Sequence, residues 1–163
     1  MMMTKTWLAR ESRSLVTCVL LLAACYASGQ GGARADESSE PLPGVYVEDA
    51  VAIPASAGDM SIIGFRLDNF SSGNVLLLGV TSEVAETALV LMRGGGTGPQ
   101  IAKTVLIMQD EILDLRTSHI WIELRGLKSE ITEGDLVHFE LIFDRGRVAA
   151  QAHAHVGTMP NAR

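Results

Sequence analysis

The chain lacks several features by which large classes of protein are recognised. Of its 163 residues only two are cysteines, both within the first 25 positions, so the rest offers no thiol for a disulfide or a nucleophile. It has no cluster of lysine and arginine, and its net charge of −6 argues against a nucleic-acid partner. No internal repeat occurs, and no stretch of eleven or more residues has the 3.6-residue apolar period of an amphipathic helix.

A long hydrophobic run is also missing, but a short one lies near the N-terminus. Residues 15–24 (LVTCVLLLAA) follow the basic residues Lys5, Arg10 and Arg13, and the run is too short to span a bilayer as a helix. This pattern is typical of an export signal. It predicts a protein of the periplasm or cell envelope, and the exported chain is more acidic than the precursor because the basic residues are removed.

Two cleavage signals follow this run, and they predict different products. Residues 22–25 (LAAC) have the form of a bacterial lipobox, in which acylated Cys25 begins a membrane-anchored lipoprotein. Residues 33–35 (ARA) form an A-x-A site for ordinary signal peptidase. The signal segment is therefore 1–24 in the first alternative and 1–35 in the second. Residues 25–43, rich in small and polar residues and proline, are expected to form a flexible linker.

Short segments of alternating polarity follow from residue 44 onward. In residues 118–125, Ile120, Ile122 and Leu124 are expected to face the core and the residues between them the solvent. Residues 136–143 show the same alternation, and a polar link with two glycines joins the two segments. Eight or nine such strands, separated by turn residues, predict an all-β sandwich or barrel over residues 44–151.

No arrangement of residues indicates an enzyme. The glycine-rich residues 93–99 (RGGGTGP) lack the Lys-Ser/Thr pair of a phosphate-binding loop, so we interpret them as a hairpin loop. Ser118 and His119 are adjacent and would point to opposite faces of a strand, which is unsuitable for a nucleophile and its base. Glu130 and Glu133 are interpreted as solvated charges in a turn.

Five segments, taken in order, resemble the PCu(A)C (PCuAC) family of periplasmic copper chaperones. They are VEDAVAI (47–53), IIGFRLDN (62–69), LLLGVTSEVAE (76–86), EILDLRTSHIWIELRGLK (111–128) and ITEGDLVHFELIF (131–143). The resemblance implies a cupredoxin-like Greek-key β-sandwich. It also implies a non-enzymatic protein that binds copper and delivers it to an apo-cuproprotein such as a terminal oxidase.

The copper motif of that family, His-x10-Met-x21-His-x-Met, is not retained. When residues 126–128 fix the register, the last His and Met of the motif fall on Trp121 and Glu123, and the first two on Ala88 and Pro99. None of these four is a suitable copper ligand. Another register recovers Met92 as a single thioether. The resemblance therefore supports the fold more strongly than a copper site at the family positions.

Two other sets of residues are candidate copper ligands. In the tail, residues 152–163, His153 and His155 are expected on one face of an extended segment, with Met159 following, and imidazole and thioether both suit copper. A shifted site would use His119 and Met92 instead. The alternative without metal is an envelope interaction module that has lost copper binding and presents Trp121 as an exposed anchor.

Overall fold

The computed structural model describes residues 41–95 and 98–157. The expected signal segment, Cys25 and nearly all of the linker lie outside the described residues, as does Met159, so those predictions stay predictions. The described residues form strands and turns and contain no helix, and thus none with the length and apolar character needed to cross a lipid bilayer. The prediction of an all-β protein is confirmed.

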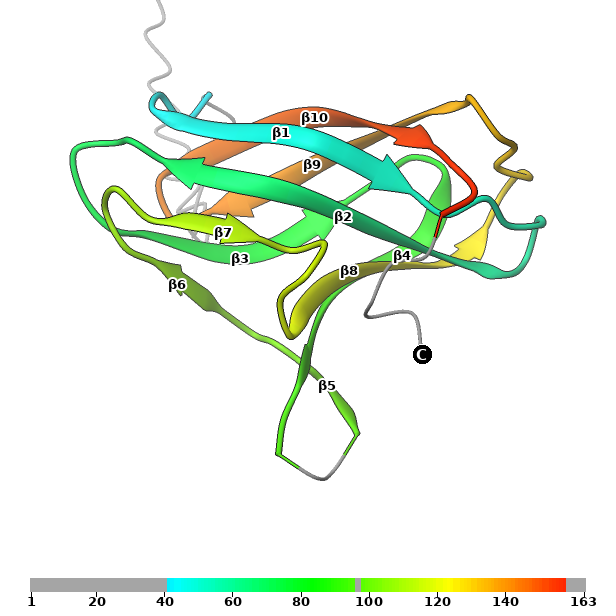
Figure 1. Cartoon of the computed structure of the whole chain (residues 1–163), viewed down its shortest axis with the longest axis horizontal. Helices are drawn as coiled ribbons and strands as arrows, with labels where there is room; N and C mark the ends of the chain where they lie inside the picture. The colour runs from blue at the N-terminus through cyan, green and yellow to red at the C-terminus, as the bar shows by residue number, and fades with distance from the viewer. Residues whose placement is uncertain (1–40, 96–97, 158–163) are drawn as a thin grey trace, which may run out of the picture. The chain divides into compact units, whose positions relative to one another are not determined.

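The described part of the chain contains ten strands, one or two more than the sequence pattern predicted. They are β1 (Val45–Ala52), β2 (Met60–Asn69), β3 (Val75–Thr81), β4 (Ala85–Arg93), β5 (Pro99–Ile101), β6 (Val105–Ile107), β7 (Ile112–Asp114), β8 (Ile120–Leu127), β9 (Leu136–Phe143) and β10 (Gly146–Ala154). They pair in the order β5-β4-β8-β2-β1-β10-β9-β3-β6, with β7 on β2. The sheet curls on itself: in Figure 1, β1 and β10 run along the top, β2 crosses the middle, and β7, β3 and β6 lie below it.

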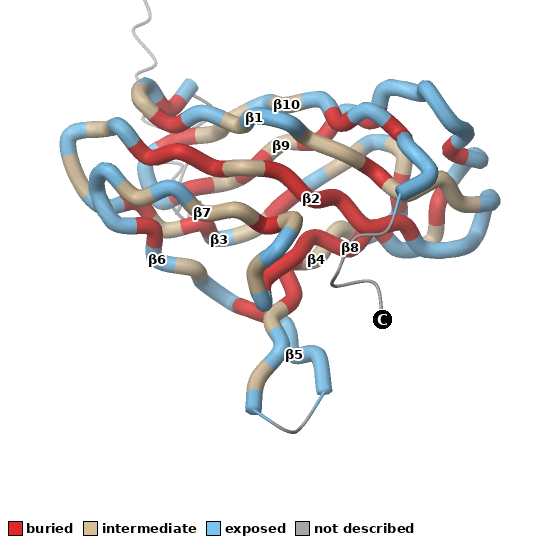
Figure 2. Tube along the Cα trace, viewed as in Figure 1, coloured by how far each residue is buried: buried red, intermediate tan, exposed pale blue. Residues whose placement is uncertain are grey.

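The core lies inside the curled sheet, and β2 contributes some of its most deeply buried side chains. Phe65, Ile63 and Leu67 of this strand are fully buried, and Phe65 packs against Phe139 of β9 with 5.5 Å between the ring centroids. Figure 2 shows β2 buried along most of its length. β9 alternates between buried residues and exposed or half-buried residues over Leu136–Phe143. This matches the expectation for a strand with one face in the core and the other in solvent.

The expectation for β8 was wrong on one face. All five residues from Ile120 to Leu124 are buried, including Trp121 and Glu123, which were expected to face solvent. The reason is the position of β8 between β4 and β2. The outer face of these strands carries a second, smaller apolar cluster of Trp121, Ile62 and Leu91, so both faces of β8 are covered. Trp121 is therefore not an exposed anchor.

Candidate metal site

Trp121 and Glu123, on which the sequence register placed the last His and Met of the family motif, are both buried in β8. Trp121 is 3% exposed, and the guanidinium of Arg93 lies 5.8 Å from the centroid of its ring. Glu123 is 7% exposed, and its Oε1 accepts a hydrogen bond from Nε of Arg125 at 2.5 Å. Trp121 is thus packed in an apolar cluster and Glu123 is paired with Arg125. Neither side chain is a soft metal ligand.

The four motif positions also do not share one face of the sheet. Leu91 lies opposite Trp121 and Leu89 opposite Glu123 in the β4–β8 ladder, so these side chains project to the outer face. Ala88 alternates with them and packs against the main core on the other face. A histidine at position 88 would therefore point away from a ligand at position 121.

The structure does not bring His119 and Met92 together as a site. The main-chain N–H of Arg93 donates to the carbonyl oxygen of His119 at 2.8 Å, so the two backbones are close. However, Met92 lies opposite Ile120 and packs against the main core, whereas the side chain of His119 is exposed in the bend before β8. No shared position for one metal ion results.

His153 and His155 lie at the end of β10, on its outer face. Ala152 and Ala154 are buried, and the two histidines alternate with them and are exposed. The N–H of His155 donates to the carbonyl oxygen of Ala52 at 3.0 Å, which continues the pairing of β10 with β1 beyond the last strand residue. Two imidazoles with this spacing project in the same direction from a well-held backbone.

Glu133 is the residue of this region that sequence reasoning missed. Its Oε1 lies 2.6 Å from Nδ1 of His155, and its Oε2 accepts the N–H of Val156 at 2.5 Å. The carboxylate reaches both partners because the turn before β9 is tied to the end of β10, with Gly134 donating to Ala154 at 2.8 Å. Glu133 and His155 are 22 residues apart, so no local spacing in the sequence could reveal the contact.

A pH titration tests how firmly this turn is held. The N–H of Val156 and the imidazole of His155 hold the pKa of Glu133 below its ordinary value, and the N–H and hydroxyl of Thr132 lower the pKa of Asp135. A carboxyl group whose pKa is lowered by folding stabilises the fold above its unfolded pKa, and this contribution is lost as the pH falls through the folded value. We expect both contacts to persist at neutral pH and to be lost only in acid.

Amide NMR shifts followed through an acid titration measure this directly. The Val156 amide should titrate with a midpoint below the ordinary carboxyl range, and Glu133→Gln should abolish that titration while the Thr132 amide still titrates with Asp135. A Val156 midpoint at or above the ordinary glutamate value would contradict the contact.

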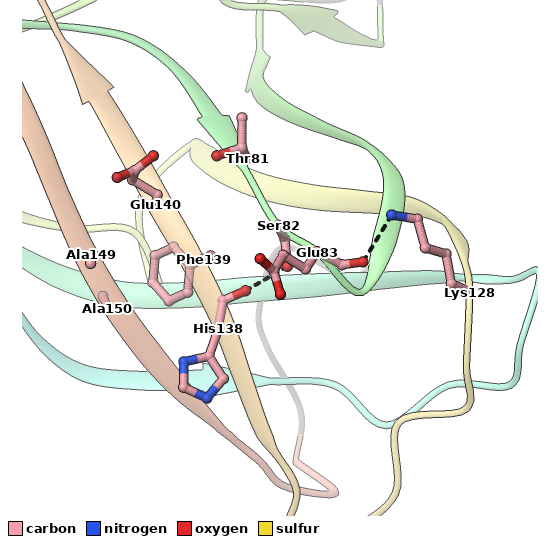
Figure 3. Close-up of a pocket in the computed structure, with 9 residues that line it drawn as sticks. All are labelled: Thr81, Ser82, Glu83, Lys128, His138, Phe139, Glu140, Ala149 and Ala150. Carbon is pink, nitrogen blue, oxygen red and sulfur yellow. Dashed lines mark hydrogen bonds between the residues drawn. The ribbon is translucent and has the colours of Figure 1, made fainter. Parts of the chain in front are cut away.

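A groove lies where the end of β3 and the residues after it meet β9 and β10. It is lined by Thr81, Ser82, Glu83, Lys128, His138, Phe139, Glu140, Ala149 and Ala150 (Figure 3). Two of its polar side chains hydrogen-bond to main-chain carbonyls: Ser82 Oγ to His138 at 2.5 Å and Lys128 Nζ to Glu83 at 2.9 Å. Across the described residues, no group of three or more His, Cys, Asp or Glu is arranged to hold a metal ion.

Comparison with known proteins gives a clear result for the fold. Neither a protein-family model nor a curated protein sequence matches the chain significantly. Among solved structures, the copper-bound PCuAC domain from PmoF2 is 12% identical, with a TM-score of 0.61, and the match covers 72% of this chain and 97% of that one. The apo PCuAC domain from PmoF1 is 16% identical, with a TM-score of 0.61 and coverage of 72% and 98%.

A third similar structure is Cu(I)-bound DR1885 from Deinococcus radiodurans. It is 21% identical to this chain, with a TM-score of 0.54, and the match covers 82% of this chain and 88% of that one. At these sequence identities the structural similarity shows the fold, and it does not show which residues bind metal. The resemblance drawn from the five sequence segments is confirmed at that level: the chain has the cupredoxin-like fold of PCuAC domains.

Proposed function

We propose that this chain is an extracytoplasmic, non-enzymatic copper-binding protein whose copper ligands are His153, His155 and Met159 instead of residues at the family positions. The fold is one whose solved examples include a copper-bound PCuAC domain and a Cu(I)-bound protein. The family positions of this chain, in contrast, are occupied by Trp121 and Glu123. Copper binding therefore has to use other residues.

The contact between Glu133 and His155 is the observation that carries this proposal. A metal-binding histidine commonly donates the proton of its other ring nitrogen to a carboxylate, which fixes the ring and its tautomer and makes the ligand more basic. With Glu133 Oε1 at 2.6 Å from Nδ1, His155 has this arrangement, which leaves its Nε2 to bind a metal ion. His153 provides a second exposed imidazole from the same face of β10.

The chemistry of these ligands suits transfer of copper. Imidazole and thioether together favour copper, and the thioether of Met159 favours Cu(I). Two imidazoles on an exposed strand end leave one side of the ion open to a ligand from another protein, as delivery to an apo-cuproprotein such as a terminal oxidase requires. Acylation of Cys25 would hold the protein at the membrane, whereas cleavage after residue 35 would release it into the periplasm.

Cu(I) titration against a competing chelator tests the proposal. We expect His155→Ala and Met159→Ala each to weaken Cu(I) binding strongly, and Glu133→Gln to weaken it about tenfold because His155 loses its orienting carboxylate. Glu133→Asp should restore part of the affinity. His119→Ala is the matched control, since it removes an exposed imidazole elsewhere, and it should have no effect. Unchanged affinity in His155→Ala and Met159→Ala would refute the tail site.

A second candidate function, an envelope interaction module without metal, is favoured by an exposed aromatic pair. Tyr46 and Phe70 are 53% and 54% exposed, with their ring centroids 6.4 Å apart. Exposed neighbouring aromatic side chains are typical anchors of protein–protein contacts. They would take the role that Trp121 cannot fill. A wild-type chain that binds no copper in the titration above would favour this function.

A further inference from the structure

Three of the four histidines of the chain lie on the outer face of two neighbouring strands. In the antiparallel ladder of β9 and β10, His138 is opposite Gln151 and His153 is opposite Leu136. Opposed residues of such a ladder project from the same face. The residues that alternate with them are buried: Val137, Phe139, Ala152 and Ala154. His138, His153 and, just beyond the strand, His155 therefore share the solvent face.

The register makes His138 and His153 diagonal neighbours. Diagonal residues of an antiparallel pair are about 7–8 Å apart, within reach of long side chains. An imidazole extends its distal nitrogen well beyond Cβ, so two such rings can turn to a single metal ion. Figure 3 shows the ring of His138 extending away from Glu140 on the β10 side of its strand. Gln151, directly opposite His138, and Leu136, directly opposite His153, are the other residues of this face beside the pair, and both are exposed.

Neither of the two rings is engaged elsewhere in the part of the chain that the structure describes. The bond from Ser82 Oγ to His138 uses the main-chain carbonyl oxygen and not the imidazole. His153 pairs with β9 and β1 through its backbone alone. Both side chains thus keep their ring nitrogens available. The backbone of His153 is paired with β1 and β9, and that of His138 is paired with β10.

We propose that His138 and His153 form a cross-strand imidazole pair that binds Cu(II). Imidazole is a borderline ligand suited to copper, and Cu(II) binds such sites more tightly than the neighbouring divalent metals. The pair contains no thioether, so it favours Cu(II), whereas the tail with Met159 favours Cu(I). The described residues place no third His, Cys, Asp or Glu with this pair, so water would complete the coordination. This inference shares His153 with the proposed function but does not depend on Met159.

Cu(II) titration of the exported chain against a chelator tests the pair. Because the second imidazole binds as part of the same scaffold, His138→Ala should weaken Cu(II) binding about a hundredfold. The control His119→Ala should leave the affinity unchanged. A His138→Ala variant that binds Cu(II) as tightly as the wild type would overturn the proposal. Since His138 is exposed, the variant should keep the far-UV circular dichroism of the wild type.

Thermal unfolding provides a second readout, because an ion held by both strands ties β9 to β10. Cu(II) should raise the unfolding temperature of the wild type and of His119→Ala, and not that of His138→Ala. The two proposals fail in different ways. If His155→Ala weakens Cu(I) while His138→Ala leaves Cu(II) unchanged, the cross-strand pair is wrong and the tail site stands. The reverse pattern leaves the pair and removes the tail site.

Discussion

Replacing Asn69 by alanine is expected to cost about 3–5 kcal/mol of unfolding free energy, because several buried polar groups lose their partner at once. Asn69 is fully buried at the end of β2. Its Nδ2 lies 2.9–3.2 Å from the carbonyl oxygens of Gly73, Ile107 and Met108, and its Oδ1 accepts the N–H and the hydroxyl of Ser71. One amide therefore joins the turn after β2 to the end of β6.

Asn74 provides the matched control for this experiment. Its Oδ1 accepts the N–H of Gln109 at 3.0 Å, so it links the same two regions of chain, but the contact is exposed. Water can replace an exposed partner, so Asn74→Ala should cost about 1 kcal/mol or less. Chemical denaturation of both variants decides the matter. Equal costs for the two would show that Asn69 is not the polar anchor of this end of the sandwich.

Asn69 also shows what sequence patterns leave out. In the sequence it appears as a turn residue after a strand, before Ser71 and Gly73. Two of its partners, Ile107 and Met108, lie 38 and 39 residues away, and only the fold brings them near. The contact of Glu133 with His155 could not be predicted either, because the two residues are 22 positions apart in the sequence. Periodicity shows which face of a strand is apolar, but it does not show which distant polar group will meet a given side chain.

The sequence pattern likewise predicted one strand better than another. The sequence pattern predicted the bounds of β9 and the alternation of its two faces, and in the structure one of these faces is buried while the other is exposed or half-buried. β8 has the same alternation, yet both of its faces are covered. The difference lies in its neighbours: Leu91 of β4 and Ile62 of β2 build a second cluster around Trp121. The alternation of residues along one strand does not show which side chains of the neighbouring strands will cover it.

Trp121→Ala is accordingly expected to have the second large effect, a loss of about 3–5 kcal/mol in unfolding free energy, because a cavity opens where the ring packs. Phe70→Ala is the matched control. It also removes an aromatic ring, but one that is 54% exposed, and it should cost about 1 kcal/mol. Circular dichroism during denaturation measures both. Similar small costs for the two variants would mean that Trp121 is not buried.

Trp121→Ala also tests whether the ring at position 121 takes part in copper binding in addition to its role in packing. If the ring at position 121 has only a structural role, folded Trp121→Ala should bind Cu(I) as tightly as the wild type, since the proposed ligands His153, His155 and Met159 are unchanged. Trp121→His should not create a family-type site, because Glu123 is paired with Arg125 and Ala88 faces the main core. A gain of copper affinity in Trp121→His would show that the family position remains usable, and it would move the centre of copper binding from the tail to β8.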